Sequence, residues 1–198
     1  MKSLDLIIIG SGNSTLEIID LIYELNKKRD EQINIVGILD DNKKLKNKKI
    51  SKIPILGSIK DINKFKKEKF FLSIFSYKNR FIRAKLIQNF KKIHNRFINI
   101  IHPSSLISPN SKIGYGCLVY NNSNIYHGSS VGNFCTILSD VSIAPKAKIE
   151  DNCFLGKSVI LSCNSKIQKN TYIGFQSSIL ENVKVFQGSR ILPNTTIN

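Results

Sequence analysis

Imidazole is the side-chain group that exchanges protons near neutral pH, and the sequence contains three histidines. His94 lies in the basic stretch 91–94, and we expect it to be a surface residue. His102 precedes Pro103, where we expect a hydrogen-bonded structural role. His127 follows an inward aliphatic residue of the repeat described below by two positions, so its ring points outward. We predict that His127 is a general base; the alternative is a polar residue at an interface.

A glycine-rich turn follows the first apolar run of the chain, residues 4–9. A helical period of apolar residues then continues to Leu25, so the segment predicts a strand, a turn and a helix. Ser14 and Glu17 have the spacing of a capping box, and we expect the helix to begin at Ser14. Its free N–H groups and positive dipole end would form an anion site. The residues that we expect to contact a nucleotide here are Gly10, Ser11, Gly12, Asn13 and Ser14.

The second apolar run, residues 33–39, ends in Asp40 and Asp41. A carboxylate at the end of a strand can accept hydrogen bonds from ribose hydroxyls, so we expect both aspartates to bind the sugar of a nucleotide. An NAD site is disfavoured because Thr15 stands where the dinucleotide fingerprint has its third glycine. A turn that binds no ligand is the remaining alternative.

Three of the four cysteines, Cys117, Cys135 and Cys153, are spaced 18 residues apart. Their regular spacing predicts one column of side chains, and we interpret it as small packing residues rather than as nucleophiles or metal ligands. Cys163 lies outside this column. No C-x-x-C spacing occurs, so we expect reduced thiols and no metal site.

The formal net charge of +16 raises the question of nucleic-acid binding. Lysine outnumbers arginine 25 to 5, and the densest basic run, residues 43–49, lacks interleaved aromatic residues and reads as a solvated loop. We therefore expect no nucleic-acid partner. No apolar run is long enough to span a membrane, and the start of the chain does not resemble a secretory signal, so we expect a cytoplasmic protein.

The second half of the chain repeats every six residues. One phase is always aliphatic, at Ile107, Ile113, Val119, Ile125, Val131, Ile137, Ile143, Ile149, Leu155, Leu161, Ile167, Ile173, Ile179, Val185, Ile191 and Ile197. The residue four positions later is always small, from Ser111 to Thr195. A large inward residue and a small corner residue are what a narrow coil of short strands requires. The repeat predicts a parallel β-helix of fifteen hexads, or five coils of three.

The first half alternates predicted strands and helices. After the two strands above come a short segment at 53–57, a helix at 59–65, a strand at 70–75, a helix at 79–90 and a strand at 97–101. This alternation is typical of a parallel α/β domain. We therefore predict an α/β Rossmann-like domain at residues 1–101, followed by a β-helix at residues 102–198.

The whole chain resembles the bacterial sugar O- and N-acyltransferases, which include sialic-acid O-acetyltransferases and UDP-amino-sugar N-acetyltransferases. The resemblance rests on Gly10-Ser11-Gly12, Leu39-Asp40-Asp41, Ile53-Pro54-Ile55-Leu56-Gly57-Ser58, Ile100-Ile101-His102-Pro103-Ser104 and Ile125-Tyr126-His127. It implies a left-handed β-helix, a homotrimer with acetyl-CoA between neighbouring β-helices, a nucleotide sugar over the first domain, and a general base at His127. The cofactor-binding residues that we assign are Thr136, Lys157 and Phe175.

The sequence departs from this family at several places, including Phe75, where a glycine usually follows the strand. Gly128 replaces the acidic residue that usually follows the catalytic histidine, and Thr136 stands where a second histidine is usual. Residues 13–15 replace a glycine-histidine-glycine end of the first turn. We expect an acetyl-CoA-dependent acetyltransferase acting on a nucleotide-linked amino sugar. The alternatives are a sialic-acid-type O-acetyltransferase and a binding homologue that has lost catalysis.

Overall fold

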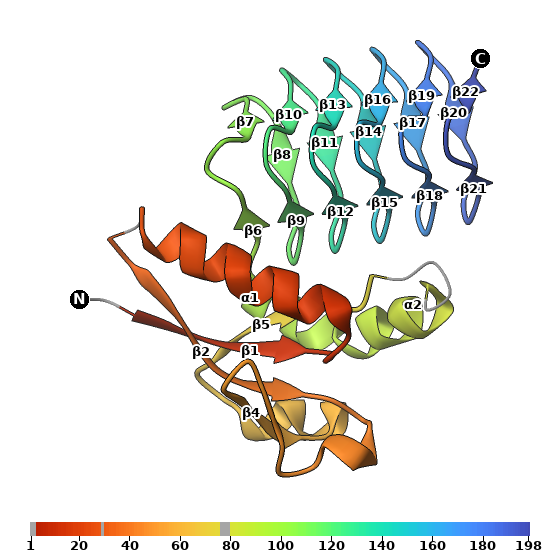
Figure 1. The fold of residues 1–198 in the computed structure, drawn as a ribbon. Helices are drawn as coiled ribbons and strands as arrows, with labels where there is room; N and C mark the ends of the chain where they lie inside the picture. The colour runs from red at the N-terminus through yellow and green to blue at the C-terminus, as the bar shows by residue number, and fades with distance from the viewer. Residues whose placement is uncertain (1–2, 29, 76–79) are drawn as a thin grey trace. The chain divides into compact units, whose positions relative to one another are not determined.

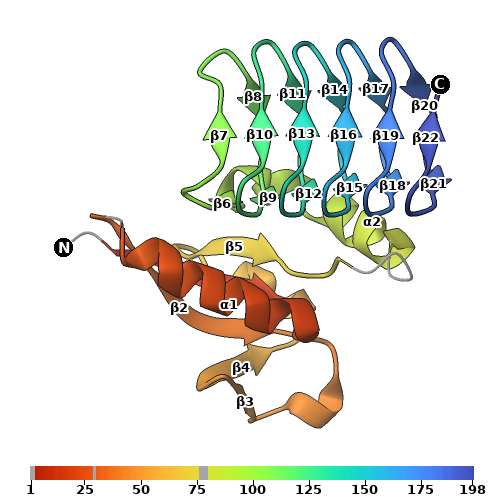
Figure 2. The same cartoon turned by 45° about the horizontal axis from the view of Figure 1, so that its top comes forward.

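The computed structural model describes residues 3–28, 30–75 and 80–198 (Figures 1 and 2). Its internal contacts divide the chain into two compact units. Unit 1 comprises Met1–Asn79 and Lys91–Ile98, and unit 2 comprises Arg80–Phe90 and Asn99–Asn198. Two elements of the predicted domain 1–101, a helix at 80–89 and a strand at 100–101, therefore have their contacts in unit 2. A folding domain that ends at residue 101 remains a prediction.

Unit 1 contains one five-stranded sheet in the order β3-β4-β2-β1-β5. Its strands are β1 (Ser3–Ile9), β2 (Gln32–Leu39), β3 (Lys49–Ile50), β4 (Ile53–Gly57) and β5 (Lys69–Leu72). All neighbours pair in parallel except β3, which is antiparallel to β4. The helical elements are α1 (Asn13–Asn26) and the 3₁₀ helices η1 (Lys43–Leu45), η2 (Ile59–Lys64) and η4 (Lys91–Arg96). The predicted α/β class is confirmed.

The apolar runs of the sequence form the core of unit 1. The residues of β1 from Leu6 to Ile9 are fully buried, as expected for a parallel strand covered on both faces. α1 contributes its buried residues Ile18, Ile19 and Ile22 at helical spacing. Apolar packing on both sides of the sheet therefore fixes the strand ends, where the polar residues of the first predicted site lie.

Unit 2 contains a three-sided parallel β-helix, visible as ladders of short strands in Figures 1 and 2. The first face holds β6 (Ile100–Ile101), β9 (Leu118–Val119), β12 (Thr136–Ile137), β15 (Phe154–Leu155), β18 (Tyr172–Ile173) and β21 (Arg190–Ile191). The second holds β7 (Leu106–Ile107), β10 (Asn124–Ile125), β13 (Ser142–Ile143), β16 (Ile160–Leu161), β19 (Ser178–Ile179) and β22 (Thr196–Ile197). The third holds β8 (Lys112–Ile113), β11 (Ser130–Val131), β14 (Lys148–Ile149), β17 (Lys166–Ile167) and β20 (Lys184–Val185).

Each short strand pairs with the strand 18 residues further along the chain, for example Asn124 with Ser142. The aliphatic phase fills the interior, and the small residues of the second phase, such as Ser123 and Ala147, are also fully buried. The predicted fold class, an α/β domain followed by a hexapeptide β-helix, is confirmed. The strand β6 extends the repeat one step toward the N-terminus, since Ile101 precedes Ile107 by six residues.

One helix, α2 (Arg80–Asn89), packs in unit 2 through a buried arginine. Nη1 of Arg83 donates a hydrogen bond of 2.8 Å to the carbonyl of Phe134 and another to Oδ1 of Asn152. Both acceptors lie at the corner between the third and first faces. Burial lowers the pKa of Arg83 to about 10. This anchor could not be predicted from the sequence, because a single arginine in a polar helix belongs to no repeat or motif.

Candidate functional site

The turn after β1 is built around Gly10. Its φ is +99°, and a Cβ atom here would lie 2.7 Å from Cγ1 of Ile74, so the position requires glycine. The N–H of Gly10 donates to the carbonyl of Leu39 at 2.9 Å, and its own carbonyl accepts from the hydroxyl of Thr15 at 2.9 Å. The residue that replaces the third fingerprint glycine thus ties the helix to the turn.

The start of α1 differs from the prediction. The helix begins at Asn13, its N-cap is Gly12, and no side chain caps it. The predicted capping box of Ser14 and Glu17 is therefore wrong, because Gly12 takes the extended cap conformation and places Ser14 inside the first turn. A helix start without a side-chain cap keeps backbone N–H groups available to an anion.

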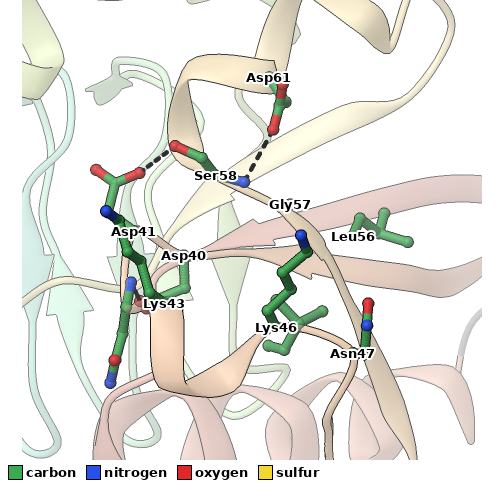
Figure 3. A pocket seen from close by; sticks show the side chains of 11 residues that line it. Asp40, Asp41, Lys43, Lys46, Asn47, Leu56, Gly57, Ser58 and Asp61 are labelled. Carbon is green, nitrogen blue, oxygen red and sulfur yellow. Dashed lines mark hydrogen bonds between the residues drawn. The ribbon is translucent and has the colours of Figure 1, made fainter.

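Ser11 and Asp40 meet at the ends of β1 and β2. The hydroxyl of Ser11 donates to Oδ2 of Asp40 at 2.6 Å, and the N–H of Asn42 donates to Oδ1 at 2.7 Å. The side chain of Asp41 has a different task, since its Oδ1 accepts hydrogen bonds from the hydroxyl of Ser58 and from the N–H of Ile59 (Figure 3). The structure therefore brings Asp40, but not Asp41, to the glycine turn.

A pocket of about 300 Å³ lies beside Asp40, between the ends of β2 and β4 (Figure 3). Its wall holds Asp40, Asp41, Asn42, Lys43, Lys46, Asn47, Ile55, Leu56, Gly57, Ser58 and Asp61. The two lysines belong to the basic run 43–49, whose lysine side chains are exposed as expected for a solvated loop, but whose place at a pocket was not predicted. They place positive charge within reach of a ligand that also contacts the carboxylates.

Asp61 holds the far wall of this pocket in place. Its carboxylate pairs with Lys64 at 2.6 Å and accepts a hydrogen bond of 2.9 Å from the N–H of Ser58, forming a capping box at the start of η2. These two contacts lower the pKa of Asp61, that with Lys64 more than that with Ser58. A Cβ atom on Gly57 would lie 2.6 Å from Oδ2 of Asp61, so this close approach depends on glycine.

His127 lies at the corner between the second and third faces, and its side chain is exposed. Its Nδ1 is 3.2 Å from Nδ2 of Asn110, one coil earlier. The carbonyl of His127 accepts from the N–H of Lys146 at 3.1 Å. His102 is held locally, since its Nδ1 accepts from the N–H of Ser104 at 3.1 Å. The two histidines thus differ as the sequence suggests, one with a local hydrogen-bonded contact and one on an open corner.

The residues assigned to the cofactor lie elsewhere on the β-helix. Thr136 is on β12 and only 2% exposed. Lys157 and Phe175 are exposed at the corner between the first and second faces, where Lys157 pairs with Asp140 at 3.6 Å. Within one chain, neither residue shares a corner with His127.

The cysteine column is buried, as the interpretation of small packing residues predicts. Each thiol donates to a carbonyl at the same corner of the next coil, at 3.0 Å for Cys117, 3.1 Å for Cys135 and 3.2 Å for Cys153. Among the described residues, no group of three histidine, cysteine or acidic side chains is arranged to hold a metal ion. None of the described helices is long and apolar enough to cross a membrane.

Comparison with known proteins gives the fold a context. Residues 5–90 match the family model of the PglD N-terminal domain. WeeI from Acinetobacter baumannii AYE is 17% identical with a TM-score of 0.81, and the alignment covers 100% of this chain and 92% of that chain. A mutant of perosamine N-acetyltransferase from Caulobacter crescentus, solved with CoA and GDP-perosamine, is 18% identical with a TM-score of 0.67 over 97% of this chain and 92% of that chain. No curated protein matches the chain.

These similarities show that the chain shares the fold of WeeI and of the perosamine N-acetyltransferase over nearly its whole length. The match to the PglD N-terminal domain covers most of the predicted first domain. The resemblance stated from the sequence is therefore confirmed at the level of the fold.

Proposed function

We propose that this protein is an acetyl-CoA-dependent N-acetyltransferase that acts on a nucleotide-linked amino sugar in bacterial surface-glycan biosynthesis. The observation that carries the proposal is that one chain combines a domain matching the PglD N-terminal model with a hexapeptide β-helix. A similar fold in Caulobacter crescentus binds CoA and GDP-perosamine. The proposal places the protein in the cytoplasm, where acetyl-CoA is made.

The nucleotide part of the substrate is proposed to bind unit 1. The uncapped start of α1 supplies N–H groups for the phosphates, and Asp40 supplies carboxylate lone pairs for the ribose. The pocket beside Asp40 adds Lys43 and Lys46, whose positive charges complement a diphosphate. Asp41 acts indirectly, because its carboxylate holds the β4–η2 junction that forms one wall.

His127 is proposed to be the general base. The neutral imidazole takes a proton from the sugar amine as the amine nitrogen attacks the thioester carbonyl, and the same proton then goes to the departing sulfur. The carbon–sulfur bond breaks as the new amide bond forms, so no covalent enzyme intermediate is required. Nε2 is the basic atom when Nδ1–H donates to Oδ1 of Asn110, which a half-turn of the Asn110 amide allows.

The site is proposed to be completed by a second chain of a homotrimer. His127 and the pair Lys157 and Phe175 occupy different corners of one β-helix. One bound acetyl-CoA can contact both sets only if the corner that carries Phe175 comes from a neighbouring copy. Threefold symmetry repeats this contact in a closed ring.

The test is thiol release from acetyl-CoA in the presence of GDP-linked and UDP-linked amino sugars, with mass spectrometry of the product. A mass increase of one acetyl group on the amine would support the proposal. Acetylation of a hydroxyl would establish the O-acetyltransferase alternative.

A binding homologue without catalysis is a second candidate, and the chemistry around His127 favours it. Gly128 supplies no carboxylate to the imidazole, and the polar partner of the ring is an amide, that of Asn110. If a nucleotide sugar binds tightly but none of the GDP-linked and UDP-linked amino sugars gives thiol release, the protein is a binding homologue and the proposed acetyltransferase activity is wrong.

A further inference from the structure

The third face of the β-helix carries a ladder of lysines. Lys148 pairs in register with Lys166, and Lys166 with Lys184, each on the outward position that precedes an inward aliphatic residue. Lys112 holds the same position two strands before Lys148, and all four side chains are exposed.

General enrichment in lysine does not produce this arrangement. On the third face, four of the five outward positions are lysine, the exception being Ser130. None of the twelve equivalent positions on the first and second faces is lysine. A compositional bias would distribute lysine over all three faces, so the ladder is a property of this face.

The ladder is electrostatically unfavourable without a ligand. Neighbouring parallel strands are about 4.8 Å apart, and like charges directly opposite one another are destabilising. None of the ion pairs in the described part of the chain involves Lys146, Lys148 or Lys166. A bound anion would remove this repulsion.

A groove of about 580 Å³ follows the ladder and begins beside the proposed catalytic corner. Its lining consists of Gly128, Lys146, Lys148, Asn164, Lys166 and Asn182. Gly128 follows His127 directly, and the N–H of Lys146 donates to the carbonyl of His127. From Gly128 to Asn182 the groove crosses three coil steps, or about 14 Å at the ordinary strand spacing.

We propose that this groove binds the phosphate groups of coenzyme A, with Lys146, Lys148 and Lys166 as the phosphate-binding side chains. The inference rests on the proposed function, because it identifies the groove as part of the acetyl-CoA site. Coenzyme A carries its diphosphate and 3′-phosphate at one end and its thiol at the other. Phosphates over the ladder therefore leave the pantetheine arm to extend along the groove toward His127.

Calorimetry with coenzyme A tests the groove without any acetyl transfer. The Lys148→Gln/Lys166→Gln variant should bind coenzyme A about tenfold to a hundredfold more weakly than the wild type, since each lysine provides a charge-assisted hydrogen bond. The Lys66→Gln/Lys67→Gln variant has the same net charge and changes exposed lysines of unit 1, so it should bind as the wild type does. Added salt should weaken wild-type binding more steeply than binding by the groove variant.

Equal affinity of the wild type and the groove variant for coenzyme A would overturn the inference. So would a loss confined to GDP, which would assign the groove to the nucleotide substrate. If acetyl transfer occurs but coenzyme A binding does not depend on these lysines, the inference about the groove is wrong and the proposed function stands. If binding depends on the lysines but no acceptor is acetylated, the inference stands and the proposed function is wrong.

Discussion

The hydroxyl of Ser11 donates a 2.6 Å hydrogen bond to Asp40, joining the turn after β1 to the end of β2. With the N–H of Asn42 on its other oxygen, the Asp40 carboxylate uses one hydrogen bond for each oxygen. A carboxylate has about four acceptor positions, so lone pairs remain for a ligand. Asp40 is thus oriented by the protein and still able to accept hydrogen bonds from ribose hydroxyls.

Replacing Asp40 by alanine should weaken the binding of GDP or UDP about tenfold to a hundredfold, because hydrogen bonds to a charged acceptor are lost. Calorimetry with both nucleotides measures the effect. Asp5→Ala is the matched control, since Asp5 is a β1 carboxylate whose partner is the side chain of Asn34. Unchanged nucleotide affinity in Asp40→Ala would show that another group holds the ribose.

Replacing His127 by alanine should lower kcat by about a hundredfold to ten-thousandfold, the usual contribution of a positioned base. His94→Ala should leave turnover nearly unchanged, and His102→Ala should mainly lower stability through the lost contact with Ser104. A His127→Ala enzyme that acetylates the same acceptor with the wild-type kcat would refute the assignment.

The six-residue period was sufficient to predict the β-helix because one aliphatic residue must face the interior in every hexad. Ile101 fits the same period, yet its neighbours read as the last strand of the first domain, so the strand predicted at 97–101 was assigned to that domain and not to the β-helix. The local sequence pattern alone does not show whether a strand at the boundary between the two domains belongs to the first or to the second. Pairing between Ile101 and Val119 decides it in the structure.

The parts of the site that sequence reasoning missed depend on contacts between distant segments. Lys46 lines the pocket because η1 folds beside the end of β4, and a basic run gives no sign of this. The prediction of a capping box at the start of α1 was wrong for a different reason. Ser14 has the right spacing from Glu17, but the extended backbone of Gly12 starts the helix earlier. The lysine ladder could have been predicted from the sequence. Lys148, Lys166 and Lys184 are 18 residues apart, and the equivalent positions of the other two faces contain no lysine.

Thiol labelling should separate Cys163 from the buried column. Cys163 is partly exposed, whereas the other three cysteines are buried. Because Cys117, Cys135 and Cys153 are at most 1% exposed, a reagent cannot reach their thiols in the folded protein. At pH 8, one thiol per chain should react with an aromatic disulfide reagent before unfolding. Cys163→Ser should lose this fast phase; a remaining fast phase would contradict the buried column.

Placing at position 15 the third glycine of the dinucleotide fingerprint should destabilise unit 1. Thr15 is fully buried, and its hydroxyl bonds to the carbonyl of Gly10 and lies 2.6 Å from the hydroxyl of Ser73. Thr15→Gly should lower the free energy of unfolding by about 2 kcal/mol, about half from the lost hydrogen bond and the rest from the lost buried methyl group and the greater backbone freedom of glycine. Thr15→Val keeps the shape and should lose about 1 kcal/mol. Urea denaturation measures both, and a stabilised Thr15→Gly protein would show that the hydroxyl has no structural role.

A site shared between chains predicts complementation. Light scattering should give about 67 kDa, three times the 22.4 kDa chain. His127→Ala and Phe175→Ala trimers should each have low activity, the first for lack of a base and the second through weaker acetyl-CoA binding. After equal amounts are unfolded and refolded together, about a quarter of the interfaces combine an intact His127 with an intact Phe175, by random assortment in a closed ring. The mixture should therefore recover about a quarter of wild-type activity, whereas mixing His127→Ala with His127→Asn should recover none. Activity no higher than that of the separate variants would place both residues outside a shared site.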